Sequence, residues 1–418
     1  MRTISRITTH AALLPLAALL PLVALLAFAG CATTPPRPPP PTLTGDALVD
    51  YQNQLAAAPE KDRALWQYRL AATALRRGEP ATAKPALDDA LSLVAANYGN
   101  INAAAARSRG LFTQEAGKPF TGEAHERVMA NYYRGILYWA DGQPDNARAL
   151  FRTGELLDSD TANKEYAGDY VLLDYLDGYV TARLGGGNPG AGADALARAR
   201  ASAAAQERAA PPDYDTTANV MVFVDYGAGP QKYAGGQDGQ QLMYRIPQAS
   251  AVSARLKVGG RNYALPPYDD IGFQAITRGG RLMDEILGNK AAFKRNADAI
   301  GDIGLIGAAA VSNSSNSKDA QIATGALLVA GLVSKLLSSA TETRADTRCW
   351  DNLPRYLSFA ALKLPPGAHE AELTFFDERG TPYAQQTQRF TITVPDPAAL
   401  PIGAAPKDVV IYRSQMRN

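Results

Sequence analysis

The chain has 418 residues, of which 46% are hydrophobic and 20% are charged, so it is long enough for two or three domains with sizeable cores. Its 42 basic residues nearly balance its 41 acidic residues, which gives no reason to expect nucleic-acid binding. Two cysteines are present, and one of them lies in the N-terminal segment.

Residues 1–30 have the order of charge and hydrophobicity that is typical of a secretory signal. Arg2 and Arg6 form a positive start, and the stretch from Ala11 to Ala29 is almost wholly apolar. The tetrapeptide Phe28-Ala29-Gly30-Cys31 then resembles the bacterial lipobox, which implies cleavage before Cys31 and acylation of its sulfur. The alternative is an N-terminal membrane anchor that is never cleaved.

Residues 31–45 connect the predicted lipid anchor to the folded part of the chain. The lipobox resemblance implies that an Asp after the cysteine would retain the protein at the inner membrane. Ala32 stands there, which favours the outer membrane. Pro35 to Pro41, broken only by Arg37, predicts a stiff polyproline spacer. Acylation of Cys31 leaves Cys349 alone, and we expect Cys349 to be a small buried residue.

Residues 46–210 show helical periodicity and almost no strand signal, which predicts an all-α domain of tetratricopeptide-like helical repeats. The clearest unit runs from Glu126 to Leu157. Within it Gly135, Tyr138, Ala147 and Phe151 have the spacing of the tetratricopeptide pattern. We expect Gly135 and Ala147 at a close approach of two antiparallel helices, with Tyr138 and Phe151 filling the space between them.

Two further helix pairs are predicted around the first. One starts at Leu65 and turns at Gly78-Glu79-Pro80, and a looser one runs from Tyr166 to Ala203. Three pairs are about the minimum that can bury a shared core. An insert between the pair that starts at Leu65 and the pair that starts at Glu126 contains GKPFTGE. This segment predicts a surface loop with Thr121 as a candidate helix cap. An irregular helical bundle is the alternative.

Residues 216–418 predict a small β-sandwich-like domain with a helical insertion at about 270–345. Pro211-Pro212 marks the boundary before it. Strands are predicted from Ala218, in a hairpin between Val252 and Leu265, and in three segments near the C-terminus. The insertion holds an apolar stretch between residues 300 and 337. We expect this stretch to be buried in the protein, with a partner interface or lipid as alternatives.

Four stretches of the sequence are distinctive, although none of them is a catalytic signature. They are GKPFTGE, the repeat segment YRGILY, VDYGAGPQK from Val224, and ADTRCWDNLP from Ala345. Together they resemble a family of bacterial envelope lipoproteins with tetratricopeptide-like repeats and no established biochemical activity. The resemblance therefore implies a place in the cell envelope rather than a reaction.

Residues suited to catalysis or metal binding are sparse. His125 and His369 are the histidines beyond the signal, and we expect both at the surface. The sequence around these histidines lacks the other ligands of a zinc site and the other residues of a catalytic triad, so no metal or cofactor is predicted. Gly227, Gly229 and Lys232 form the most suggestive loop for a ligand or partner, because Lys232 could meet an anion or a carboxylate. A simple β-turn is the alternative, and we favour it.

These patterns predict a non-enzymatic outer-membrane lipoprotein that acts as a scaffold or adaptor for protein partners in the cell envelope. Tetratricopeptide-like helix pairs form a concave surface that suits peptides or partner helices. One alternative is a binder of envelope glycan or a small ligand through the β-domain, and a hydrolase comes third. An exposed groove on the helices would favour the scaffold, whereas solvent-facing aromatic clusters on the β-domain would favour the glycan.

Overall fold

A computed structural model describes residues 41–101, 117–159, 168–237, 239–248, 251–277, 345–399, 401 and 406–416. The signal segment, Cys31 and the apolar stretch between residues 300 and 337 lie outside the described residues, so what the sequence predicts for them stays a prediction. From Thr42 onward the chain forms one compact unit. Within the described ranges, every helix is too short or too polar to span a bilayer.

The N-terminal part of this unit is helical and the C-terminal part contains the sheets, which confirms the predicted α+β class. The α-helices are α2 (Ala47–Ala57), α3 (Arg63–Arg76), α4 (Pro80–Ile101), α6 (Ala124–Ala140), α7 (Pro144–Asp158), α8 (Val171–Leu184), α9 (Ala193–Ala205) and α10 (Ile271–Ile276). The strands are β1 (Val220–Ala228), β2 (Gln231–Gly235), β3 (Gln241–Arg245), β4 (Ser253–Val258), β5 (Arg261–Leu265), β6 (Asp269–Asp270), β7 (Pro354–Leu362), β8 (Gly367–Phe376), β9 (Gln388–Val394) and β10 (Val409–Ser414).

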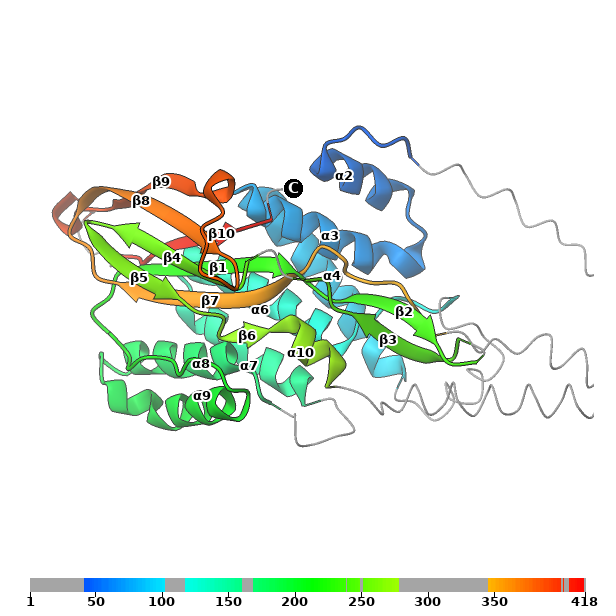
Figure 1. Ribbon diagram of the computed structural model, residues 1–418, viewed down its shortest axis with the longest axis horizontal. Coiled ribbons are helices and arrows are strands. Elements are labelled where there is room, and N and C mark those ends of the chain that lie inside the picture. The colour runs from blue at the N-terminus through cyan, green and yellow to red at the C-terminus, as the bar shows by residue number, and fades with distance from the viewer. Residues whose placement is uncertain are drawn as a thin grey trace, which may run out of the picture. The chain divides into compact units, whose positions relative to one another are not determined.

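The helices pack as the predicted pairs α3/α4, α6/α7 and α8/α9, and neighbouring pairs touch through α4 with α6 and α7 with α8 (Figure 1). The first two pairs have the same turn chemistry. Gly78 and Gly142 take positive φ angles of 72° and 79°, a conformation that costs glycine little. Pro80 and Pro144 then open the second helices, where the missing N–H of proline has no helical acceptor to lose.

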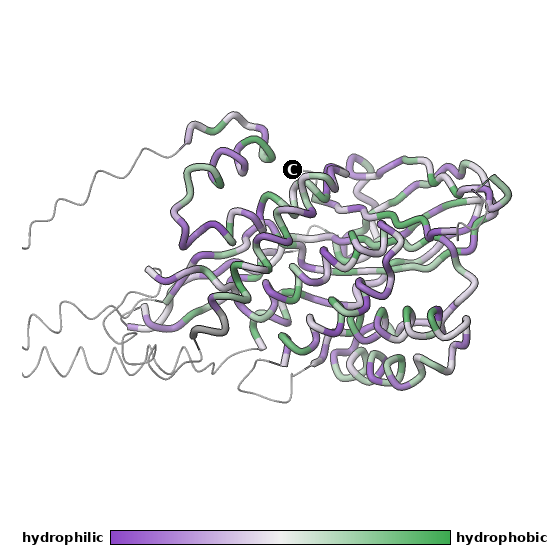
Figure 2. Tube along the Cα trace, turned by 180° about the vertical axis from the view of Figure 1, so that it is seen from behind, coloured by the Kyte–Doolittle hydropathy of each residue, from purple (hydrophilic) through white to green (hydrophobic). Residues whose placement is uncertain are grey.

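Two four-stranded sheets pack face to face, and the first of them also packs against the helices. The first has the order β10-β1-β7-β6, with β10 parallel to β1, and the second has the order β5-β4-β8-β9. Alternate residues of β1 face opposite cores: Met221 and Phe223 pack with the helices, while Val222 and Val224 pack with the second sheet. Figure 2, seen from behind, shows the helices in front of the strands. Both cores therefore meet at the first sheet.

In the pairs α6/α7 and α8/α9, helices α6 and α8 lie between their partner helices and the first sheet. All residues of α6 except Tyr138 and Ala140 are buried, and α8 is buried along most of its length. By contrast, α7 and α9 bury one narrow stripe each. Rings from both sides meet at this boundary, with Trp139 and Phe223 centroids 6.0 Å apart. The side of α6 and α8 that faces the first sheet is thus covered by the chain's own strands and forms no open groove for a partner.

The segment GKPFTGE is less exposed than the sequence predicts. Phe120 is only 3% exposed, and its N–H donates to the carbonyl of Lys61 at 2.7 Å. The cap of α6 is Glu123 rather than Thr121, because Glu123 and Glu126 form a reciprocal capping box. The loop therefore lies at the surface, as predicted, but is anchored by the buried ring of Phe120.

Candidate functional site

Three of the four stretches singled out by the sequence meet at a buried carboxylate, Glu126 on α6, which is fully buried. Its Oε2 lies 2.6 Å from Nζ of Lys232, and it accepts the N–H of Glu123 at 2.7 Å. Its Oε1 accepts the N–H of Trp350 at 2.7 Å. Burial opposes the charged form, but Lys232, the neighbouring His125 and the hydrogen bonds together lower the pKa of Glu126 below its ordinary value.

A second buried carboxylate, Asp225 on β1, joins the YRGILY segment to the sheet. The hydroxyl of Tyr133 donates to its Oδ2 at 3.0 Å, and the hydroxyl of Tyr412 on β10 donates to the same oxygen. Burial raises the pKa of both phenols well above the ordinary value, and the charge of Asp225 adds to the rise. Both phenols therefore stay protonated as donors, so this cluster fastens α6 to β1 and β10.

The loop predicted for a ligand or partner belongs to this junction. Gly227 has φ 73°, and its N–H donates to Oε1 of Gln415 at 2.8 Å. A Cβ on Gly229 would lie 2.6 Å from the carbonyl oxygen of Leu353, so only glycine allows this approach of two backbones. The side chain of Lys232 is only 2% exposed. Lys232 does meet a carboxylate, as the sequence allows, but that carboxylate is Glu126 of the same chain.

The residues predicted for repeat packing lie at the contact between α6 and α7. A Cβ on Gly135 would lie 2.6 Å from Cε1 of Phe151, and Ala147 and Phe151 are fully buried. Tyr138 is half-buried under the guanidinium of Arg134, whose Cζ is 3.7 Å from the ring centroid. The structure therefore brings Gly135, Ala147 and Phe151 together and places Tyr138 at their edge.

The two histidines and the cysteine differ in their exposure. His125 is only 2% exposed, so the predicted surface position is wrong; its ring packs edge-on against Tyr244 of β3. His369 is half-buried, with Nε2 2.8 Å from the carbonyl oxygen of Pro365. Cys349 is buried as predicted, and burial raises the pKa of its thiol to about 12. Among the described residues, no group of His, Cys, Asp and Glu side chains is arranged to hold a metal ion.

Two open pockets adjoin the segment that leads into β10, and Pro406 and Lys407 line both of them. The first, which we call the proline pocket, has a volume of about 640 Å³. Its walls include Leu364, Val394 and five prolines: Pro365, Pro366, Pro395, Pro397 and Pro406. The second, which we call the turn pocket, has a volume of about 670 Å³ and lies at the turn between α6 and α7. Its lining includes Trp139, Arg183, Leu184 and Asp408.

The segment that borders both pockets is fastened to the helices. Asp408 accepts a hydrogen bond from Nε1 of Trp139 at 2.9 Å and pairs with Arg183 at 2.7 Å. Nζ of Lys407 donates to the carbonyl of Asp141 at 3.0 Å, and a Cβ on Gly142 would lie 2.7 Å from the Lys407 chain. The pocket walls are thus held by contacts between the C-terminal strand and the α6–α7 turn.

Comparison with protein-family models, with curated proteins and with solved structures gives no match. Sequence reasoning also misses the two pockets. The available signal is the concentration of prolines at Pro365-Pro366, at Pro395 and Pro397, and at Pro406, which by itself indicates only turns. The pockets arise because three loops, far apart in sequence, end beside one another.

Proposed function

We propose that the protein is a non-enzymatic outer-membrane lipoprotein that acts as an adaptor, anchored through Cys31, and that the proline and turn pockets receive a segment of a partner protein of the cell envelope. The helix pairs are interpreted as tetratricopeptide-like repeats and the two sheets as a small β-sandwich. The observation that carries the proposal is the pair of open pockets on a shared border at Pro406 and Lys407. The binding surface thus moves from the inner helix face, which the sheet covers, to the C-terminal edge.

The size and placement of the pockets suit an extended chain segment. Each volume, about 640 and 670 Å³, lies within the range of sites that hold a small molecule or several side chains. An extended segment presents side chains at regular intervals, so one segment can fill both openings across the border at Pro406. Because proline has no N–H, the walls of the proline pocket offer few groups for pairing with a strand. Recognition there must use side chains.

The chemistry of the linings supports binding rather than catalysis. Among the described residues that line the two pockets, none is a serine, cysteine or histidine. Asp408 is the carboxylate of the turn pocket, and Arg183 and Trp139 hold it in place. A general base or nucleophile needs a free group that can reach a substrate, and this carboxylate is already engaged.

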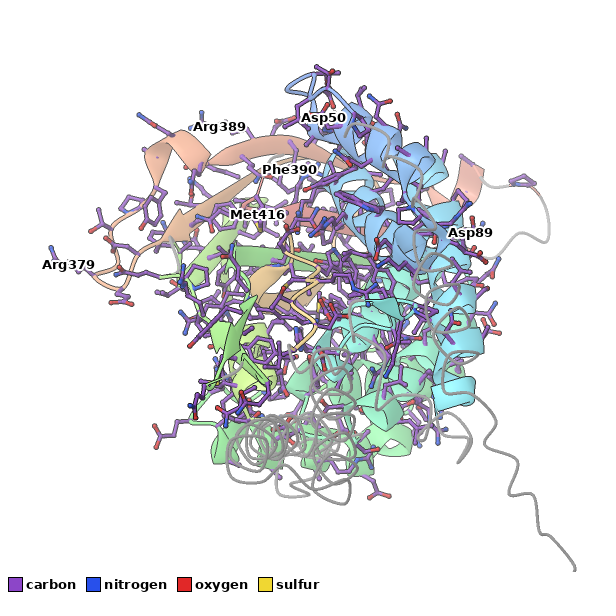
Figure 3. All side chains as sticks on the ribbon, turned by 90° about the vertical axis from the view of Figure 1, so that its right-hand side faces the viewer. Asp50, Asp89, Arg379, Arg389, Phe390 and Met416 are labelled. Carbon is purple, nitrogen blue, oxygen red and sulfur yellow. The ribbon has the colours of Figure 1, made fainter. Side chains whose placement is uncertain are left out.

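Crosslinking in cells tests the adaptor proposal. A photoreactive benzoylphenylalanine is placed at Leu184, which is 55% exposed in the turn pocket, and separately at exposed Pro397 in the proline pocket. The control position is Arg379, which is labelled in Figure 3 and lies in the loop from the end of β8 to the start of β9. The proline pocket lies at the other end of these two strands. We expect both pocket positions to crosslink to the same protein and Arg379 not to. No crosslink at either pocket, or an identical pattern from Arg379, would contradict the proposal.

The lipid anchor is tested by Cys31→Ser in the full chain. We expect the variant to lose its acyl chains and to remain unprocessed, because the cysteine is both the cleavage boundary and the attachment point in the lipobox resemblance. Fractionation and mass measurement distinguish the two forms. A variant that is still processed to the same size and is still firmly membrane-bound would show that the anchor assignment is wrong.

A binder of glycan or another small ligand is the second candidate, because Tyr233 on β2 is 41% exposed beside Met243, its cross-strand neighbour. Exposed rings stack on the flat faces of sugars. Two exposed residues on a hairpin form no cluster of rings, however, and the adaptor is therefore the first candidate.

A further inference from the structure

We infer that the proline pocket selects an acidic group next to a flat apolar side chain in the partner segment. The inference rests on the proposed adaptor function and specifies the chemistry of what is bound. It follows from the groups that the pocket offers and from those that it lacks.

The floor of the proline pocket is apolar and poor in hydrogen-bond donors. Five prolines contribute flat rings without N–H groups, and Leu364 and Val394 add aliphatic surface. Asn219 is the amide in the lining, and its side chain is already used. It donates to the carbonyl of Leu364 at 2.9 Å and accepts the N–H of Leu364 at 3.0 Å. A ligand rich in hydroxyl groups would lose water here and gain few partners, whereas a ring would bury apolar area.

The charged side chains among the described lining residues of the pocket are both basic. Lys363 and Lys407 both line the pocket, and no Asp or Glu is among its described lining residues. Lys363 is exposed and forms no ion pair within the described part of the chain. Lys407 donates to a backbone carbonyl, that of Asp141, while the Asp141 carboxylate pairs with Lys84 at 2.6 Å. The Lys363 ammonium therefore remains available to a carboxylate, and Lys407 adds its positive charge from the border with the turn pocket.

The acid nearest in sequence, Asp396, is not among the described lining residues. Asp396 lies between two of the lining prolines, but its Oδ1 accepts the N–H of Ala398 at 2.9 Å in its own turn. An incoming acidic group thus meets the free ammonium of Lys363 and the positive charge of Lys407, with no acid among the described lining residues, while its neighbouring side chain contacts the apolar part of the pocket. This combination favours a Glu or Asp beside an aromatic residue or a proline in the partner.

Two dyes that share a ring system measure the preference for an acid. One is 8-anilinonaphthalene-1-sulfonate, and the other is the neutral N-phenyl-1-naphthylamine; both are titrated by fluorescence into the chain from Thr42 to Asn418, which forms one compact unit. In the double variant Lys363→Gln, Lys407→Gln we expect the affinity for the anionic dye to fall about fivefold to tenfold, with the neutral dye changed less than twofold. Lys257→Gln removes one exposed lysine of β4 as the control and should change neither affinity.

A peptide pair then separates a protein segment from a small amphiphile. Acetyl-Glu-Phe-Pro-Ala-amide should displace the anionic dye from the unsubstituted chain several-fold better than the peptide with Gln in place of Glu. Equal affinity of the anionic dye for the chain and for the double variant overturns the inference. Failure of both peptides, with the dye still dependent on the lysines, also overturns it and assigns the pocket to a small anionic amphiphile. If the acid preference is absent but Leu184 still crosslinks to a protein, the inference is wrong and the proposed adaptor function is retained.

Discussion

The buried ion pair of Glu126 and Lys232 joins α6 to β2, and the loss of one partner leaves a charge without its counter-ion. We predict that Lys232→Met lowers the free energy of unfolding by about 3–5 kcal/mol, because the Glu126 carboxylate, which is fully buried, would lose its cation. Urea denaturation measures the change. The double variant Glu126→Gln, Lys232→Met should recover part of the loss. A cost below about 1 kcal/mol for Lys232→Met would show that the pair is not buried as described.

The contact of Gly135 with Phe151 allows a second prediction for a single residue. Gly135→Ala places a methyl group against the Phe151 ring, since a Cβ at this position would lie 2.6 Å from Cε1 of that ring. Overpacking of this kind costs about 1–3 kcal/mol, to be measured as a lower midpoint of urea unfolding. Phe151→Leu provides space, so the cost of Gly135→Ala should be smaller in that background than in the parent chain. Strict additivity of the two changes would argue against the contact.

Between α7 and α8, an acidic cluster makes stability depend on pH. Burial and, after it, the neighbouring Asp174 raise the pKa of Glu155 to about 9. Arg148 pairs with Asp177 and Arg198 with Asp174 at the same contact. The ordinary pKa of this carboxyl is 4.5, so the folded chain keeps a proton that the unfolded chain releases between pH 4.5 and about 9. The contribution to stability is therefore complete below pH 4.5 and is lost as the pH rises toward about 9.

Glu155→Gln should remove this dependence, because glutamine keeps the shape of the protonated carboxyl and cannot ionise. We predict that the melting midpoint of the parent chain falls between about pH 6 and pH 9 and that the midpoint of the variant changes less over the same range. Glu378→Gln, at an exposed position between β8 and β9, is the matched control. Parallel curves for the parent chain and Glu155→Gln would exclude the cluster as the cause.

The elements that the sequence predicts are those whose pattern is local. The helix pairs follow from their turns, and β1, β4, β5, β8, β9 and β10 follow from alternation or from a glycine turn. Strand β7 is missed because it is buried on both faces, so Pro354 to Leu362 forms a largely apolar run with no period of two. The hairpin of β2 and β3 is missed because its residues are half-exposed and polar.

The burial of His125 is a case in a helix where the local sequence pattern is again insufficient. The polar residues at the start of α6 indicate a solvent-facing side, yet β3 and the segment around Trp350 cover that side. The ion pair of Lys232 with Glu126 joins residues 106 positions apart, and no local pattern can indicate such a contact. The sequence does not predict the pockets for the same reason, because they form between loops that are far apart in the sequence.

At the scale of the whole molecule, the helices share one core with the first sheet, and this leads to a prediction about fragments. The contacts of Trp139 with Phe223 and of Tyr179 with Phe359 hold the inner helices to the first sheet. We predict that a fragment of residues 42–210 lacks cooperative thermal unfolding and binds 8-anilinonaphthalene-1-sulfonate strongly, because the sheet-facing side of α6 and α8 becomes exposed. Circular dichroism and dye fluorescence measure this against residues 42–418. A sharp, reversible unfolding transition of the fragment would show that the helices fold independently.

The parallel pairing of β10 with β1 has a consequence for synthesis. Residues Val409 to Ser414 leave the ribosome long after Val220 to Asp225, with which they pair on an inner strand of the first sheet, and Asp408 just before them holds Trp139. The helices can form as they emerge, but their final packing must wait until Asp408 and β10 have been synthesised. A messenger that stops a few codons before Asp408 would therefore yield a product without the edge strand. Trp139 would lack the carboxylate of Asp408, Asp225 would lack the hydroxyl of Tyr412, and cellular proteases would treat the product as unfolded.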